Sequence, residues 1–113
     1  MEERRTARRY KLDLQVEIRL ESDLKEFEPI LGRTRDVSTN GFYFRIGRGL
    51  DVGMRIGFSI MPPWVDRETI DPFIKGLARV VRVEEVSENS IDRVGVGAVF
   101  EAYKFGRAEW SAF

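Results

Sequence analysis

The chain has 113 residues, a length typical of one domain with a single core. Its 19 basic and 19 acidic side chains cancel, which argues against a general binder of polyanions. The sequence has no Cys and no His, so disulfides and thiol nucleophiles are excluded, the commonest metal ligand is missing, and no metal or cofactor is expected.

An arginine-rich arm, residues 1–10, precedes the first predicted strand. Four arginines fall within six residues, Arg4, Arg5, Arg8 and Arg9, and the second and fourth of them form an Arg-x-x-x-Arg pair. The segment has no apolar periodicity, so we expect an exposed, flexible arm. A guanidinium can meet phosphate oxygens, or the O6/N7 edge of guanine, with two parallel hydrogen bonds. A disordered basic tail without a ligand is the alternative.

Apolar and polar residues alternate over residues 11–21, which predicts a half-buried strand. One face of this strand carries Leu12, Leu14, Val16, Ile18 and Leu20. A shorter strand is expected over residues 30–36 and leads directly into the second polar motif.

That motif is Asp-x-Ser-x-x-Gly, formed by Asp36, Ser38 and Gly41 at the predicted turn between two strands. The Asp36 carboxylate can accept hydrogen bonds from guanine N1–H and N2–H, and the Ser38 hydroxyl can donate or accept. Gly41 allows a positive φ or the close approach of a ligand, and Asn40 is a further candidate contact. An ordinary turn with no binding role is the alternative.

The rest of the chain predicts four more short strands and no internal helix. These strands cover residues 42–46, 54–60, 74–84 and 94–100, with a proline-rich loop over 62–72 and a polar turn over 85–92. Six amphipathic strands joined by short connections bury their apolar faces best in a closed antiparallel β-barrel, here over residues 11–103. The tail, residues 104–113, is expected to form at most a short helix.

The order and spacing of the two motifs resemble the PilZ family. Asp36 follows Arg9 by 27 residues, and an aromatic strand comes directly after Gly41. Residues 78–83 are similar to the family's penultimate strand, and residues 94–100 to its Gly-x-Gly-x-x-Phe final strand. The resemblance covers residues 4–101. It implies an all-β, six-stranded antiparallel barrel that binds the bacterial second messenger cyclic di-GMP, although the C-terminal helix usual in the family is short or missing here.

The resemblance also implies how the ligand is held. In the family the arginine arm wraps over the ligand while the turn cups a guanine from the other side. An additional arginine before the pair, here Arg4, accompanies binding of a stacked ligand dimer, so we expect two molecules per domain. The binding residues implied are Arg4, Arg5, Arg9, Asp36, Ser38 and Gly41, with Arg8 and Asn40 as further candidates. The chain would act as a stand-alone receptor whose arm orders on binding and relays the signal to an unidentified effector protein.

Three other functions compete with this reading. A PilZ-like barrel without ligand binding would act as a protein-interaction module. An enzyme would need a nucleophile and base, and no such pair can be named without His or Cys. A barrel for single-stranded nucleic acid would need a positive groove with exposed aromatics, which the zero net charge disfavours. No apolar run approaches the roughly 18 residues that span a bilayer, and the charged start of the chain lacks a signal-peptide pattern, so a cytoplasmic location is expected.

Overall fold

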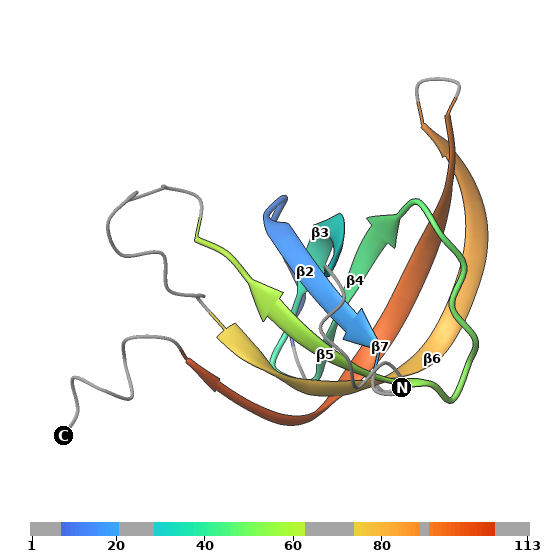
Figure 1. Cartoon of the computed structure of the whole chain (residues 1–113). Coiled ribbons are helices and arrows are strands. Elements are labelled where there is room, and N and C mark those ends of the chain that lie inside the picture. Colours follow the sequence, from blue (N-terminus) through green and yellow to red (C-terminus); the bar gives the residue numbers. More distant parts are fainter. Residues whose placement is uncertain (1–7, 21–28, 63–73, 89–90, 106–113) are drawn as a thin grey trace, which may run out of the picture.

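The computed structural model describes residues 8–20, 29–62, 74–88 and 91–105, which form one antiparallel sheet (Figure 1). Its strands are β1 (Tyr10–Lys11), β2 (Gln15–Leu20), β3 (Ile30–Val37), β4 (Gly41–Ile46), β5 (Arg55–Ile60), β6 (Ile74–Glu88) and β7 (Ile91–Phe105). The described ranges contain no helix, and hence none long and apolar enough to cross a membrane.

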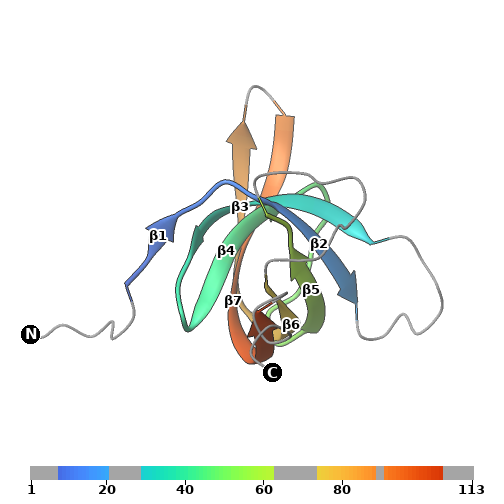
Figure 2. The same cartoon turned by 90° about the vertical axis from the view of Figure 1, so that its left-hand side faces the viewer.

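The sheet closes on itself because β3 pairs with β2 along one edge and with β4 along the other. The strands β5, β6 and β7 complete the ring between β2 and β4. The short β1 stands outside the ring, on the N-terminal side of the barrel, and pairs with the end of β3, where Lys11 lies opposite Asp36 (Figure 2). The predicted six-stranded antiparallel barrel is confirmed.

The first predicted strand is interrupted between β1 and β2, a break that its alternation does not predict. The side chain of Thr34, a fully buried residue of β3, occupies the break. Its hydroxyl donates to the carbonyl of Leu12 at 2.5 Å and accepts from the amide of Leu14 at 2.9 Å. The amide of Thr34 donates to the carbonyl of Leu14 at 2.8 Å. A side chain thus supplies the bonds that the ladder lacks here, so the buried backbone groups stay satisfied.

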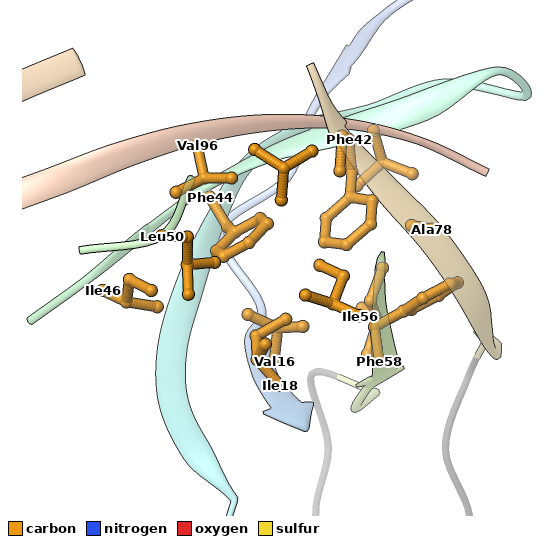
Figure 3. Close-up of a cluster of buried hydrophobic side chains, with 14 of the residues drawn as sticks. Val16, Ile18, Phe42, Phe44, Ile46, Leu50, Ile56, Phe58, Ala78 and Val96 are labelled. Atoms are coloured by element: carbon orange, nitrogen blue, oxygen red, sulfur yellow. The ribbon is translucent and has the colours of Figure 1, made fainter. Parts of the chain in front are cut away.

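The core lies inside the barrel, where the alternating apolar faces meet, as the sequence predicts. Figure 3 shows side chains of β2, β4, β5 and β7 converging there. Val16, Ile18, Phe44, Ile56 and Val96 have no exposed surface. The ring of Phe42 lies 5.0 Å from that of Phe44 and 4.9 Å from that of Phe58, distances at which aromatic pairs attract beyond simple burial.

The predicted polar turn over residues 85–92 is wrong, because β6 continues to Glu88 and β7 begins at Ile91. In this stretch Glu85 pairs with Val94 and Ser87 with Asp92. Figures 1 and 2 both show the hairpin rising beyond the other strands. Outside the barrel both faces of a hairpin meet solvent, so its sequence is polar although β6 and β7 remain paired with each other.

The chain ends bear on several expectations. Tyr10 belongs to β1, and β7 runs through Phe105. Residues 1–7 and 106–113 lie outside the described residues. Arg4 and Arg5 are among them, and the expected flexibility of the arm and the expected short C-terminal helix also fall on these segments.

Candidate functional site

The Asp-x-Ser-x-x-Gly motif forms the turn between β3 and β4. The amide of Ser38 donates to the carbonyl of Gly41 at 2.9 Å. The Ser38 hydroxyl oxygen accepts from the amides of Asn40 at 3.1 Å and Gly41 at 3.3 Å. Two backbone donors that the turn leaves without a ladder partner are thereby satisfied. Ser38 therefore has a structural role in addition to the ligand contact that the motif predicts.

Gly41 is needed for a different reason from a left-handed backbone. Among the described glycines the positive φ belongs to Gly53, at 95°. Gly41 is buried at the start of β4, opposite Val99 of β7. A Cβ added there would overlap the carbonyl oxygen of Ala98 and lie 2.9 Å from the Cα of Val99. The close approach of two strands, and not the conformation of the turn, requires glycine at this position.

The fold brings the arm and the turn together. Because Lys11 pairs with Asp36, the residues just before Lys11 lie beside the turn. The Nε of Arg9 lies 3.9 Å from the Oδ1 of Asp36. The Arg9 side chain is 50% exposed and that of Asp36 25%. An ion pair this long and this exposed contributes little to stability, so Arg9 can turn to a ligand at small cost. Arg8 is also exposed, one residue earlier.

A cavity of about 230 Å³ opens beside this ion pair. The described motif residues that line it are Arg9, Asp36, Ser38, Asn40 and Gly41. Its other walls are largely apolar and include Val81 of β6 and Val99 of β7, which are exposed at 49% and 39%. Apolar walls beside a few convergent polar groups are typical of a small-molecule site.

A second, more polar cavity of about 520 Å³ adjoins the first. Four residues line both cavities: Arg9, Asp36, Tyr43 and Arg82. The larger cavity also contacts Lys11, Arg35, Arg45, Asp13 and Glu84. Its lining thus includes five cationic side chains and three carboxylates, and the cationic surplus favours an anion.

The outer face of β4 and β6 also belongs to the candidate site, although neither signature motif includes it. Tyr43 is 8% exposed although it points away from the core, and its hydroxyl donates to Oε2 of Glu84 at 2.5 Å. The guanidinium carbons of Arg45 and Arg82 lie 6.0 and 5.5 Å from the centre of the Tyr43 ring, within reach of a cation–π contact. Burial raises the pKa of Tyr43, and the hydrogen bond to Glu84 raises it further, so the phenol remains a donor at neutral pH.

One sequence signal marks Arg82. In residues 78–84 the apolar residues are Ala78, Val80, Val81 and Val83, so two successive valines break the period of two. Such a break indicates a bulge, and bulges turn side chains to the other face of a strand. No comparable signal marks Tyr43, whose burial depends on the strands beside it.

The side chains that line the two cavities suit binding through hydrogen bonds and charge. The described residues hold no cluster of three or more His, Cys, Asp or Glu side chains that would suit a metal ion. The groups that converge on the cavities are guanidiniums, carboxylates and a phenol, which suit hydrogen bonding to a planar base and to phosphates.

Two solved structures have a fold similar to that of this chain. The structure is similar to the PilZ domain of YcgR from Escherichia coli, solved with cyclic di-GMP, with a TM-score of 0.60 and 17% identity over 88% of this chain and 79% of that chain. It is also similar to the Bacillus subtilis inhibitor of motility MotI/DgrA, with a TM-score of 0.65 and 20% identity over 97% of this chain. The chain spans 47% of the length of that protein, and at these identities both likenesses show the fold alone.

Comparison of the sequence with protein families shows the family of the chain. No curated protein matches the chain in sequence. The family model of the PilZ domain, a domain of binding and regulatory proteins, matches residues 3–102, which include the four arginines of the arm, the turn and the barrel as far as Ala102. The chain therefore belongs to the PilZ family.

Proposed function

We propose that the chain is a receptor for cyclic di-GMP. The observation that carries this proposal is the meeting of Arg9 and Asp36, which come from two motifs far apart in sequence and line the same cavity. Support also comes from the PilZ family match and from the likeness to a PilZ domain solved with this ligand.

The chemistry of the two side chains suits guanine. Asp36 accepts hydrogen bonds from guanine N1–H and N2–H, while an arginine donates to O6 and N7. Adenine presents an amino group where guanine has O6, so an arginine directed there meets a donor and stays unpaired. An unpaired polar group costs about 1–3 kcal/mol when buried, so the site would reject cyclic di-AMP.

The arm provides the relay in this proposal. Arg4, Arg5 and Arg9 close over the phosphates and guanines, and the ordered arm presents a new surface to an effector protein. Arg4 supplies the additional guanidinium that a stacked pair of ligands needs, so saturation is expected at two molecules per domain. A receptor of this kind works in the cytoplasm, where its nucleotide is made.

Calorimetric titration of the chain with cyclic di-GMP, cyclic di-AMP and GTP tests the proposal. We expect binding of cyclic di-GMP and much weaker binding of the other two. The same titration, at protein concentrations far above the dissociation constant, measures the stoichiometry. Equal affinity for all three nucleotides, or no binding of cyclic di-GMP, would rule the receptor out.

A second candidate is a PilZ barrel that binds a protein partner without a nucleotide. The similarity to an inhibitor of motility over 97% of this chain is compatible with it. The two candidates differ in the titration: the interaction module shows no heat with any of the three nucleotides.

A further inference from the structure

The final strand opens a trough on the outer face of the barrel, because Gly95 and Gly97 carry no side chains there. A Cβ at Gly95 would overlap the hydroxyl of Tyr43 and lie 2.7 Å from its Cζ. A Cβ at Gly97 would lie 3.6 Å from the Cβ of Arg82 and 4.0 Å from the Cδ1 of Tyr43, which is ordinary contact. The phenol ring therefore fills the trough over Gly95, and its hydroxyl reaches Glu84 of β6.

A bulge in β6 brings Arg82 to this trough. The pairing of β6 with β7 shifts between Val80 and Arg82. Val80 has no exposed surface, so strict alternation would turn Arg82 into the core. The extra residue, Val81, turns it outward instead, to an exposed position with its guanidinium carbon 5.5 Å from the centre of the Tyr43 ring.

Contact with the ring leaves the donors of Arg82 available. A guanidinium meets an aromatic ring through its flat face, whereas its five N–H groups lie in the plane and point outward. Within the described part of the chain, no carboxylate forms an ion pair with Arg82. Its edge can therefore take a phosphate with two parallel hydrogen bonds while its face stays on Tyr43.

The position of Arg82 matches a ligand that has both bases and phosphates. It lines the smaller, apolar cavity and the larger, cationic one, as Arg9 does. A nucleotide with its base between the apolar walls would extend its phosphate toward the cationic side. We infer that Arg82, held on the ring of Tyr43, is a phosphate-binding residue of this site outside both signature motifs. This inference rests on the proposed binding of cyclic di-GMP.

Titration of variants with cyclic di-GMP tests the role of Arg82. Loss of a charged hydrogen-bond pair should raise the Kd of Arg82→Ala about tenfold or more. The same variant should show a weaker dependence of log Kd on log salt concentration, because one phosphate contact is gone. Arg79→Ala is the matched control: it removes an arginine of the same strand that pairs with Glu101 and lines neither cavity, so its Kd should stay unchanged.

Two glycine variants test whether Tyr43 positions Arg82. Gly95→Ala should displace the phenol ring and raise the Kd. Gly57→Ala, in β5, should leave the Kd within about twofold, because its added Cβ lies 3.9 Å from its nearest contacts and Gly57 lines neither cavity. Arg82→Lys keeps the charge but loses the planar fork, so its Kd should fall between those of the wild type and Arg82→Ala. Circular dichroism of each variant checks that the barrel is folded.

The outcomes separate this inference from the receptor proposal. If Arg9→Ala weakens binding while Arg82→Ala keeps the wild-type Kd and salt dependence, Arg82 has no ligand role and the receptor proposal stands. If the wild type does not bind cyclic di-GMP, both fall together. Should Arg82→Ala not fold, the Arg82→Lys variant and the two glycine variants decide: equal Kd values across all three and the wild type overturn the inference.

Discussion

Two groups of charged residues on the outside of the barrel are satisfied in different ways. Arg55 and Arg79 both pair with the carboxylate of Glu101, at 2.8 and 2.7 Å. Beside the turn, by contrast, Arg9 stands 3.9 Å from Asp36, and half of its side chain is exposed. The first group is closed on itself and joins β5, β6 and β7. The side chains of the second group are loosely held, so they can bind a ligand instead of each other.

This difference shows that arginine by itself does not mark a binding site. The partners of each arginine decide, because a guanidinium with short bonds to a carboxylate has donors already occupied by that partner. A guanidinium that is loosely paired beside a cavity can direct its donors to a ligand instead. The experiments below test this contrast, from the largest expected effect to the smallest.

Gly41→Val should damage the loosely held region most, through its backbone. A side chain at this position would collide with the β7 backbone at Ala98 and Val99, so we expect a loss of about 3 kcal/mol in the free energy of unfolding. Ligand binding should fall with it. Thermal denaturation measures the effect. Gly49→Ala is the control, because no atom lies within 4 Å of its added Cβ, and equal melting temperatures for the two variants would refute the close-approach account.

Arg9→Ala, and likewise Arg5→Ala, should weaken binding of cyclic di-GMP by about 2 kcal/mol, because each loses a guanine or phosphate contact. The melting temperature should hardly change, since the ion pair of Arg9 with Asp36 is long and exposed. Calorimetric titration compares these variants with Arg55→Ala in the closed group, which should bind normally. Unchanged affinity in Arg9→Ala would remove the arm from the site.

Ser38→Ala should lower the free energy of unfolding by about 1 kcal/mol, because two turn amides lose their acceptor. Binding should weaken as well, since the turn forms one wall of the cavity. Chemical denaturation and titration of the same sample measure both quantities. A variant with full stability and reduced affinity would show that the hydroxyl serves the ligand alone.

Glu101→Gln should have the smallest effect and should act on the closed group. Desolvation raises the pKa of Glu101, but the hydrogen bond with Arg79 and the charges of Arg55 and Arg79 lower it more, so its net pKa is below the usual value. A lowered pKa in the folded state stabilises the fold above the unfolded pKa, and this contribution is lost as pH falls through the folded pKa.

The melting temperatures of the wild type and Glu101→Gln should therefore differ slightly at pH 7 and converge at low pH. Titration with cyclic di-GMP at pH 7 should give the same Kd for both. A difference in melting temperature that grows as the pH falls would contradict the direction of the pKa shift.

Most of the barrel could be predicted from alternation, because a side-chain period of two is read directly from the sequence. The alternation of residues 11–21 gave the inner face of β2 correctly, yet the break at Leu12–Leu14 could not be foreseen. It depends on Thr34, which belongs to another strand and was not singled out by any local pattern. The extended β6–β7 hairpin was missed because polar residues indicate solvent, and solvent surrounds a projecting hairpin as well as a turn.

The residues of the candidate site also divide into those that a local motif contains and those that lie outside both motifs. Arg9, Asp36, Ser38, Asn40 and Gly41 stand in two local motifs, and all of them line one cavity. Tyr43 and Arg82 belong to no motif. They come together because β7 lies between β4 and β6 and places Gly97 opposite both of them. A sequence shows which residues a strand presents, but the strand that will lie beside it is a property of the whole fold.

The Thr34 connection has a consequence for the kinetics of binding. Because the segment between β1 and β2 is tied to β3, the root of the arm has a fixed place beside the cavity. Arg5 precedes Arg9 by four residues, so its Cα can lie no farther than about 14 Å from that of Arg9. A ligand already held by the turn would therefore meet Arg5 as a tethered neighbour. The effective concentration of Arg5 at the ligand is then set by the four peptide units that join it to Arg9.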